Sequence, residues 1–429
     1  MLHSWCVQAE WNAPTVVGGQ GARFWDEAGR QYLDMSSLAE CMNLGHQHPA
    51  LIRAIQAQAQ KLCFVNSSWG AGPRAELAER LLERSGFAGG RVFFTLGGAD
   101  ANEHAVKFAR QASGRTQGKI VTRDRSYHGA SYATMALSGD SRIPQRDDDP
   151  FGVLHVPPPY AYRCPYGTDD ELECAERNVA HIGEVIAREG SQNVAAVLME
   201  PSAGTNGIIA PPNYWPRLRE ETRNRDVYLI ADEVMSGFGR CGEWFACAAY
   251  GEEGKPDLMT LAKGLTGAHI PLGAVVLAEH VAAKLEHSML STGLTYCGHP
   301  LACAAGVAAI AAYDDERLIE RSRHLGRAML RRLEEMQNTH AVIGDVRWGG
   351  GLFAIAELVK DRRTREPLEP WPGVHPSMHK FVSLARERGV SFAIRGNLII
   401  LAPPLVIPEK DLQWALDTMD GLLGELNWS

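Results

Sequence analysis

Residues 91–103 read RVFFTLGGADANE: a short apolar strand, two glycines, and immediately the start of a helix. Similar apolar runs follow at 119–122, 194–199, 227–231 and 273–277, separated by helical patterns. Strands that alternate with helices predict a mostly parallel sheet with helices on both faces. We therefore expect an α/β fold built around this central region.

Different patterns flank the central region. From about residue 341 onward, strand-like pieces lie among helices, which predicts a smaller α+β domain. Residues 361–376 are rich in charge and proline, so we expect an exposed excursion there. The other expected elements are a hairpin turn at 26–30, helices over about 49–62, 75–84, 301–313 and 316–336, and strands at 351–356 and 398–401.

The length of the chain predicts more than one core. The chain has 429 residues, whereas a domain usually holds roughly 100–200. We predict that residues 1–60 pack with the small domain, residues 61–310 form the large domain, and residues 311–429 form the C-terminal small α+β domain.

Composition argues against several kinds of partner and site. A formal net charge of -8 gives no reason to expect nucleic acid or an anionic membrane. The longest apolar run, 301–313, is too short to span a bilayer, and residues 1–14 lack a secretory signal. The nine cysteines include no C-x-x-C pair, and their odd number fits a reducing cytosol better than a disulfide framework. We therefore expect a cytoplasmic protein without a metal site.

The two glycines after the first central strand are candidates for anion binding. A strand that runs through Gly97 and Gly98 into a helix aims backbone N–H groups and the positive helix end at an anion such as a phosphate. The alternative is an ordinary turn in which the glycines allow close packing.

Two further strands end in carboxylates. One leads to Glu200, and another leads to Asp232 and Glu233. In open α/β sheets ligands bind at the carboxyl ends of the strands. A carboxylate there can bind metal, act as a base or pair with a buried cation; the alternative is a cap for the following turn.

Lys263 lies in an unusual setting for a lysine. The chain has only nine lysines among its 43 basic residues, and Lys263 stands in an apolar run just before the strand 273–277. Burial disfavours the ammonium, lowers its pKa and yields an amine suited to a Schiff base. The alternative is a lysine that extends along apolar surface to reach solvent.

Together these features predict a pyridoxal-phosphate (PLP) site. The cofactor needs a phosphate-binding loop, an acid that keeps the pyridine nitrogen protonated, and a lysine that carries it. The Gly98 loop, Asp232 and Lys263 supply these three parts, and Tyr127 after another strand could stack on the ring.

The order of short motifs extends this interpretation. They are YLD at 32–34, GHQHP at 45–49, the loop 97–103, YHG at 127–129, IADEV at 230–234, FGR at 238–240, AKG at 262–264 and TYCGHP at 295–300. In this order the chain resembles the class III (subgroup II, ω-type) aminotransferases of PLP fold type I, from about residue 24 to residue 404. The resemblance implies a large domain with a mostly parallel seven-stranded sheet and a small α+β domain formed by both terminal segments.

The resemblance also assigns roles to individual residues. Lys263 matches the lysine of the internal aldimine, which also moves the proton between donor carbon and cofactor, and Asp232 matches the acid on the ring nitrogen. The remaining cofactor-binding matches are Gly98 and Ala99 at the phosphate, Tyr127 and Val234 on the ring faces, His128 beside Tyr127, and Glu200 near the ring hydroxyl. Thr295 matches a threonine that reaches the neighbouring subunit's phosphate, which implies a homodimer or a dimer of dimers.

The implied reaction moves an amino group from an amine or ω-amino acid to a keto acid, pyruvate or 2-oxoglutarate. Dialkylglycine decarboxylases, aminomutases and phospho-lyases share these motifs and remain alternatives. A non-catalytic assembly protein that kept the fold is a third.

Two positions in the substrate pocket, Ala393 and Glu40, depart from the family. Many ω-transaminases have an arginine for the substrate carboxylate where this chain has Ala393, and Arg395 lies two residues later on the same strand face. Glu40 stands where several members carry a tryptophan; it would favour amines with a second positive group, or it points to solvent or pairs with an arginine. Trp69 is a candidate to line the pocket instead.

Overall fold

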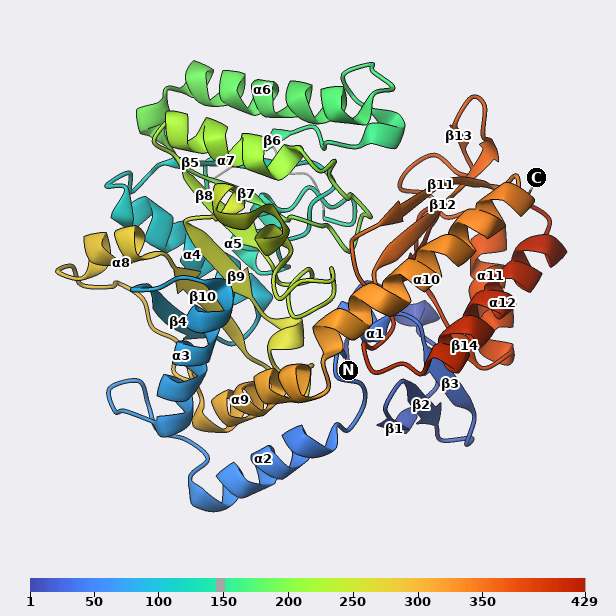
Figure 1. The fold of residues 1–429 in the computed structure, drawn as a ribbon, viewed down its shortest axis with the longest axis horizontal. Helices are drawn as coiled ribbons and strands as arrows, with labels where there is room; N and C mark the ends of the chain where they lie inside the picture. The colour runs from blue at the N-terminus through green and yellow to red at the C-terminus, as the bar shows by residue number, and fades with distance from the viewer. Residues whose placement is uncertain (144–150, 429) are drawn as a thin grey trace.

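The structure is a computed structural model that describes residues 1–143 and 151–428. Its centre is a seven-stranded sheet in the order β4-β10-β9-β8-β7-β5-β6 (Figure 1). Only β10 runs antiparallel to its neighbours β4 and β9, and the other adjacent pairs are parallel. The bounds are β4 (Arg91–Thr95), β5 (Lys119–Arg123), β6 (Val153–Val156), β7 (Val194–Met199), β8 (Tyr228–Asp232), β9 (Leu258–Leu261) and β10 (Gly273–Leu277). The α/β prediction is confirmed.

Apolar side chains on both faces of this sheet explain its helical layers. Successive strand residues point to opposite faces, so Leu198 and Ile230 belong to one buried cluster and Val197 and Leu229 to another. The helices that cover the sheet or pack beside it are α2 (Pro49–Lys61), α3 (Gly72–Ser85), α4 (Gly98–Ala112), α5 (Tyr132–Leu137), α6 (Glu171–Glu189), α7 (Tyr214–Asn224), α8 (Glu279–Leu285) and α9 (Pro300–Asp315).

Two smaller sheets lie beside the large one. The first has the order β1 (Val16–Gln20), β2 (Arg23–Asp26), β3 (Gln31–Asp34) and β14 (Val390–Ser391). The second has the order β11 (Ile343–Trp348), β12 (Ala354–Asp361), β16 (Leu398–Leu401) and β15 (Ala393–Arg395), with β13 (Glu366–Pro367) paired to β12. The helices of this region are α1 (Ser37–Glu40), α10 (Leu318–Thr339), α11 (Pro376–Glu387) and α12 (Glu409–Glu425).

The N-terminal strands join the C-terminal region through β3, which pairs with β14. Helix α2, in contrast, packs against α9 of the large unit (Figure 1). The domain boundaries at 60 and 310 stay predictions. Short 3-10 helices complete the fold at Gln8–Glu10, Ala161–Arg163, Ser191–Asn193, Ala246–Gly254 and Lys263–Leu265.

The sequence predicted several elements closely and missed others. The bounds of β4, β7, β10 and β16 match the predicted runs, and the turn at 26–30 joins β2 to β3. β6 and β9, each four residues long, were not predicted. The strand expected at 351–356 begins later, at Ala354, since the chain bends at residues 350–352 and the Gly349 N–H closes this loop on the Phe353 backbone oxygen.

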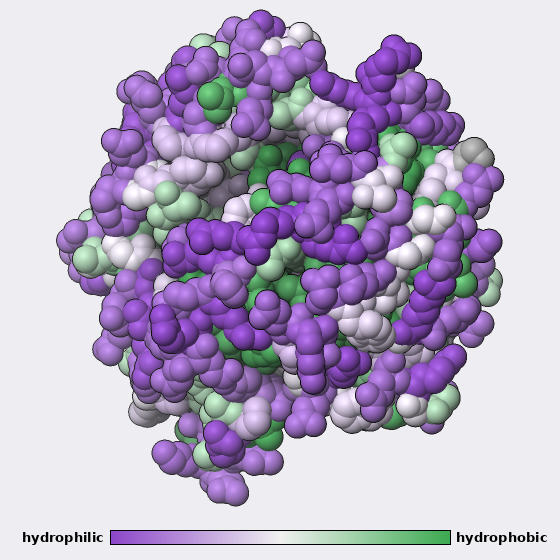
Figure 2. Space-filling view, turned by 45° about the vertical axis from the view of Figure 1, so that its right-hand side comes forward, coloured by the Kyte–Doolittle hydropathy of each residue, from purple (hydrophilic) through white to green (hydrophobic). Residues whose placement is uncertain are grey.

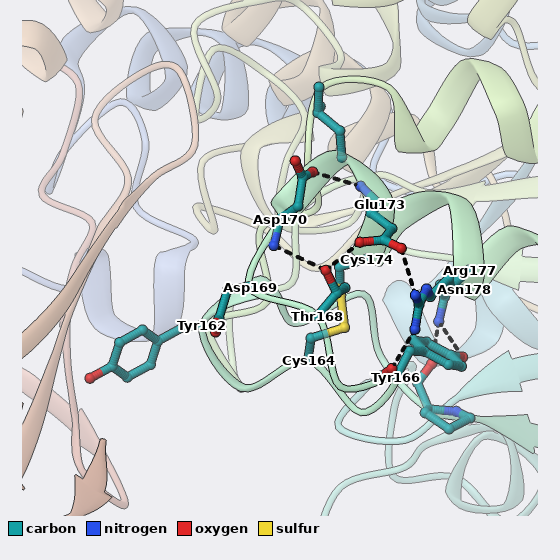
Figure 3. Close-up of a disulfide and its surroundings, with 12 residues drawn as sticks. Tyr162, Cys164, Tyr166, Thr168, Asp169, Asp170, Glu173, Cys174, Arg177 and Asn178 are labelled. Carbon is teal, nitrogen blue, oxygen red and sulfur yellow. Dashed lines mark hydrogen bonds and ion pairs between the residues drawn. A yellow bond between two sulfur atoms is a disulfide. The ribbon is translucent and has the colours of Figure 1, made fainter. Parts of the chain in front are cut away.

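Cys164 and Cys174 form a disulfide at the start of α6 (Figure 3), with Cα atoms 6.1 Å apart. The expectation of no disulfide framework is therefore wrong for this pair, because an odd number of cysteines says nothing about which two meet. The side chain of Asp170 caps α6 by accepting from the Glu173 N–H at 2.9 Å, which holds the second cysteine in place. The other seven cysteines are free.

The surface on the side shown in Figure 2 is mainly hydrophilic, with apolar residues showing in hollows between polar ones. Among the residues that the structure describes, no helix is long and apolar enough to cross a membrane. The same residues hold no cluster of His, Cys, Asp or Glu suited to a metal ion.

Candidate active site

A cavity of about 400 Å³ opens at the carboxyl ends of the central parallel strands. This is where an open α/β sheet places its ligands. Many of its lining residues were predicted from sequence: Gly98, Ala99, Tyr127, His128, Glu200, Asp232, Val234 and Lys263. The structure thus brings together residues that lie up to 165 positions apart (98 to 263).

The loop at Gly97 and Gly98 forms the N-terminus of α4 at one side of the cavity. The first N–H groups of a helix have no partner within the helix, and the helix dipole makes this end positive. A Cβ atom at Gly98 would stand 2.9 Å from Cγ1 of Val234, so only glycine lets the two segments meet this closely. The loop therefore fits a phosphate, and Val234 lies directly against it.

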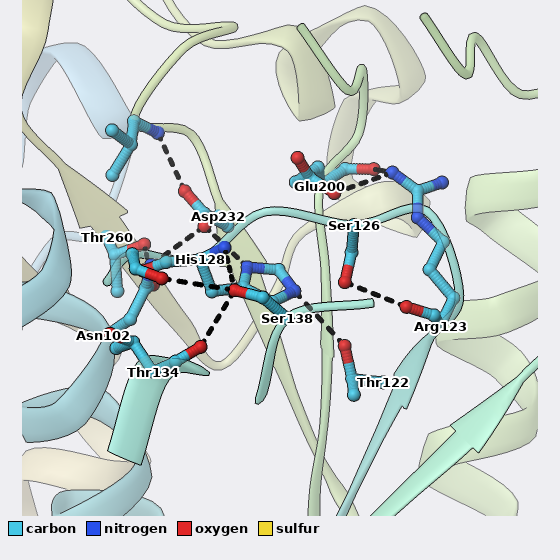
Figure 4. Close-up of polar contacts among 12 residues, drawn as sticks. Asn102, Thr122, Arg123, Ser126, His128, Thr134, Ser138, Glu200, Asp232 and Thr260 are labelled. Atoms are coloured by element: carbon cyan, nitrogen blue, oxygen red, sulfur yellow. Dashed lines mark hydrogen bonds and ion pairs between the residues drawn. The ribbon is translucent and has the colours of Figure 1, made fainter. Parts of the chain in front are cut away.

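Asp232 is a cavity carboxylate with a polar partner on each of its two oxygens (Figure 4). It ends β8 and is only 3% exposed. Its Oδ2 accepts from Nδ2 of Asn102 at 2.8 Å and lies 2.7 Å from Nδ1 of His128, while Oδ1 accepts from the Val234 N–H at 3.0 Å. Because a carboxylate only accepts, Nδ1 of His128 carries the proton.

Further polar groups fix these partners of Asp232. Nε2 of His128 lies 3.1 Å from the Thr122 hydroxyl, within hydrogen-bond distance. Asn102 also donates to the backbone oxygen of His128 at 2.8 Å and accepts from the Thr260 hydroxyl at 2.7 Å. Sequence reasoning assigned no role to Asn102, although its place one helical turn after Gly98 puts it on the same face of α4.

Glu200 lies at the end of β7 and pairs with a buried arginine. Its Oε2 stands 2.9 Å from Nη2 of Arg123, and the two residues are 6% and 0% exposed. Arg123 was not predicted as a partner. Its strand, β5, runs parallel beside β7, so both side chains leave the sheet at the same edge. The pairing does not support the alternative of a simple turn cap for Glu200.

Tyr127 forms part of the cavity wall, and burial raises the pKa of its phenol. The N-terminal segment reaches this wall, because the ring of Trp5 meets Tyr127 edge-on with centroids 6.1 Å apart. The guanidinium of Arg142 lies over Trp5 at 4.1 Å. None of the first eleven residues was predicted to lie at the site.

Lys263 follows β9 and enters the cavity from a strained backbone, with φ at 35°. Its Nζ donates to Oε2 of Glu40 at 2.9 Å. Burial lowers the pKa of Lys263, but the charge and hydrogen bond of Glu40 outweigh burial, so the pKa lies above 10.5. The predicted decrease is therefore wrong in this structure, because the sequence did not reveal the carboxylate. Glu40 itself points neither to solvent nor to an arginine.

Glu40 and the other predicted pocket residues lie outside the lining of this cavity. Arg395 donates from Nη2 to Oδ1 of Asp140 at 2.6 Å, and Arg142 binds the other oxygen of Asp140 at 2.8 Å. Trp69 is 69% exposed, and Thr295 is exposed as well. Their assigned roles stay predictions.

The residues present fit PLP. The N-terminus of α4 can bind its phosphate, and the Asp232 carboxylate can bind a protonated ring nitrogen. Lys263 supplies an amine in the same cavity. Donors on Asp232 come from α4, from the Tyr127 loop and from the backbone, which keeps this carboxylate aimed in one direction.

A family model described as aminotransferase class III matches residues 7–423. The chain belongs to this family. A curated relative of this class III aminotransferase is the putrescine–pyruvate aminotransferase of Pseudomonas aeruginosa, which is 33% identical over 416 residues, 94% of this chain and 89% of the relative.

Solved structures show the same fold. An amine transaminase from an uncultivated Pseudomonas species, in its PLP-bound internal aldimine form, superposes with a TM-score of 0.94 at 32% identity and covers 100% of this chain and 99% of its own. The taurine:2-oxoglutarate aminotransferase of Bifidobacterium kashiwanohense, in complex with PLP and glutamate, has a TM-score of 0.92 at 35% identity and covers 99% and 95%. The predictions of fold, enzyme class and cofactor are confirmed for the family to which the chain belongs.

Proposed function

We propose that this class III aminotransferase carries PLP on Lys263 and moves an amino group from an amine or ω-amino acid to pyruvate or 2-oxoglutarate. The observation that carries the proposal is the meeting of Lys263, Asp232 and the α4 terminus in one cavity. The named relatives support the acceptors, because one acts with pyruvate and another with 2-oxoglutarate.

Each residue has a separate task in this proposal. PLP, when bound, supplies an electron sink and a carbonyl group that accepts the amino group. The N–H groups at Gly98 and Ala99 bind its phosphate, and Asp232 holds the proton on its ring nitrogen. Lys263 removes the proton from the donor carbon, and a general base of this kind typically contributes a 10²–10⁴-fold rate increase.

The acceptor's carboxylate requires a cationic partner, and we propose Arg395. Ala393 and Arg395 share β15, but Arg395 already pairs with Asp140, so it has to exchange that partner for the substrate. Arg395→Ala should raise the KM for the keto acid while the amine half of the reaction keeps its rate. An unchanged KM would show that another cation binds the carboxylate.

For the donor, the buried carboxylate of Glu40 favours amines that carry a second positive charge. The Pseudomonas aeruginosa relative, whose name includes the diamine putrescine, supports this choice. We expect putrescine to be deaminated with a lower KM than butylamine, which has the same chain length but one charge. Equal KM values for the two amines would contradict a preference of Glu40 for a second positive charge.

We also propose a homodimer, or a dimer of dimers, in which Thr295 reaches the neighbouring cofactor's phosphate. Apolar side chains near Thr295 are exposed: Trp69 by 69%, Tyr296 by 57% and Phe64 by 37%. Phe64 and Tyr296 are in ring contact at 5.8 Å, so they form one patch suited to a partner surface. Light scattering on the purified protein tests the assembly, and Thr295→Ala should weaken PLP binding.

A cytoplasmic location remains part of the proposal, and two observations bear on it differently. Seven free cysteines fit a reducing compartment, whereas the Cys164–Cys174 disulfide fits an oxidising one. Thiol titration of protein taken directly from cells, under alkylating conditions, decides whether that pair is oxidised there.

The decisive experiment is the half-reaction. An amine added to PLP-loaded protein should bleach the absorbance of the bound cofactor and leave pyridoxamine phosphate, and pyruvate or 2-oxoglutarate should restore the colour. Lys263→Ala should not bleach. Release of carbon dioxide or phosphate without a keto acid would instead support a decarboxylase or lyase on the same scaffold.

A further inference from the structure

Glu40 is a buried carboxylate with one partner. Its side chain is 8% exposed, and the hydrogen bond from Nζ of Lys263 at 2.9 Å is the only one that the carboxylate makes within the described part of the chain. A buried charge is stable only when it is paired. The state of Glu40 therefore depends on where the Lys263 amine lies.

The backbone that carries Glu40 has an unusual conformation, and Ser37 at its start is bound on two sides. Four consecutive residues, Ser37 to Glu40, have positive φ angles of 47°, 42°, 74° and 56°, a left-handed turn that is costly for residues other than glycine. The Ser37 hydroxyl donates to the backbone oxygen of Ala402 at 2.6 Å and accepts from Nη2 of Arg240 at 3.0 Å. Such strain persists only where the surrounding contacts enforce it, and it clusters at functional sites.

Several charged or titratable groups face this pair from different elements. Glu40 and Cys41 approach Lys263 from the α1 segment, and Asp232 approaches from the end of β8. Burial raises the pKa of Tyr127, and the Lys263 charge in turn lowers it electrostatically. Arg240 and Glu40 also attract each other electrostatically. Asp232 already accepts from Asn102, His128 and the backbone, whereas Glu40 is the carboxylate that binds Nζ directly.

We propose that Glu40 is a positioning residue for Lys263: whenever Nζ has no covalent bond beyond its own side chain, the Glu40 carboxylate holds it as an ammonium at the wall of the cavity. The inference rests on the proposed function, in which Nζ alternates between a bound and a free state. Nζ then acts as a nucleophile, or as the base of the proposed function, only after one proton leaves to water. Burial alone would favour the neutral amine, and Glu40 reverses that preference.

The test measures the protonation of Lys263 without measuring turnover. The full chain, freed of PLP, is treated with limiting acetic anhydride at pH values from 7 to 11, and mass spectrometry compares acetylation of Lys263 with that of exposed Lys61. An opposite charge at this range shifts a pKa by about 1–3 units. At pH 8.5 we therefore expect Lys263 of Glu40→Gln to react at least about ten-fold faster than in the parent chain.

Two further variants make the result specific. Glu40→Asp keeps the charge and should keep Lys263 slow, which a role in packing alone does not explain. Glu316→Gln removes a carboxylate that pairs with His48 outside the cavity, so acetylation of Lys263 should stay as in the parent chain. Circular dichroism confirms that each variant is folded before labelling.

Equal labelling of Lys263 in the parent chain and in a folded Glu40→Gln variant would overturn the inference. Rapid labelling in Glu40→Asp would overturn it as well. The half-reaction remains a separate measurement: bleaching without a labelling difference supports the proposed function and rejects the role of Glu40. A labelling difference without bleaching supports the role of Glu40 and rejects the proposed function.

Discussion

Asn102→Ala should weaken catalysis more than its effect on stability accounts for. The side-chain amide makes three hydrogen bonds: to the charged Asp232, to the backbone oxygen of His128, and from the Thr260 hydroxyl. The bond to the carboxylate is worth about 1.5–3 kcal/mol and each neutral bond about 1 kcal/mol. The free energy of unfolding should therefore fall by about 3.5–5 kcal/mol.

A matched control separates stability from catalysis. Asn178 on α6 is fully buried and donates to the Pro157 backbone oxygen at 2.7 Å and to the Tyr166 hydroxyl at 3.1 Å, far from the cavity lining. Asn178→Ala should lose about 2 kcal/mol of stability through its two neutral bonds. It should leave the rate of the half-reaction unchanged.

The assay combines urea unfolding with stopped-flow absorbance of the half-reaction at saturating amine. Without Asn102 the Asp232 carboxylate loses one of its orienting donors, and each 1.4 kcal/mol of lost transition-state stabilisation slows the reaction by about ten-fold. We expect Asn102→Ala to bleach at least about ten times more slowly than the parent chain. A parental rate in Asn102→Ala, or an equal slowing in Asn178→Ala, would refute the assigned role of Asn102.

Three further outcomes are expected. Gly264→Ala places a Cβ within 2.7 Å of neighbouring side-chain atoms beside Lys263, which should cost about 1–3 kcal/mol and lower the melting temperature; an unchanged melting temperature would contradict the contact. Replacing Cys164 and Cys174 together by serine should lower the unfolding free energy by about 3 kcal/mol in urea, and a reductant should then have no further effect on the variant. Burial raises the pKa of Asp257, but hydrogen bonds, including those from Arg219, hold it below 3.8, so its stabilisation is present above that pH and is lost as the pH falls through the folded pKa. Asp257→Asn should accordingly destabilise the protein at pH 7 and differ less from the parent chain at pH 3 in urea unfolding.

Local patterns were enough to predict the parts of the site that come from one strand and its following turn. The Gly98 loop and Asp232 lie directly after apolar runs, and a parallel sheet brings such ends to one edge without further information. The lysine was predicted for the same reason, from an apolar run before β10. These features depend on periodicity over a few residues, which a sequence shows directly.

Contacts between distant segments could not be predicted in this way. Glu40 and Lys263 are 223 residues apart in the sequence. Their contact depends on a left-handed turn that contains no glycine, so the sequence gives no sign of it. The Arg123–Glu200 pair requires knowledge that β5 and β7 are neighbours, which the order of strands along the chain does not provide. The Cys164–Cys174 bridge likewise depends on a loop conformation, whereas the sequence supplies only a cysteine count.

The two carboxylates nearest to Lys263 differ in a way that separates their tasks. Asp232 accepts from three donors that belong to rigid elements, so its charge and direction stay constant whatever occupies the cavity. Among the described residues the Glu40 carboxylate accepts one hydrogen bond, from Nζ of Lys263, so under the proposal its pairing changes each time Nζ forms or loses a covalent bond. A carboxylate with constant partners suits the ring nitrogen, which must stay protonated throughout. A carboxylate whose partner changes suits a lysine that, in the proposal, loses and regains its covalent bond. Loss of Asp232 should therefore affect every step, whereas loss of Glu40 should affect those in which the lysine is free.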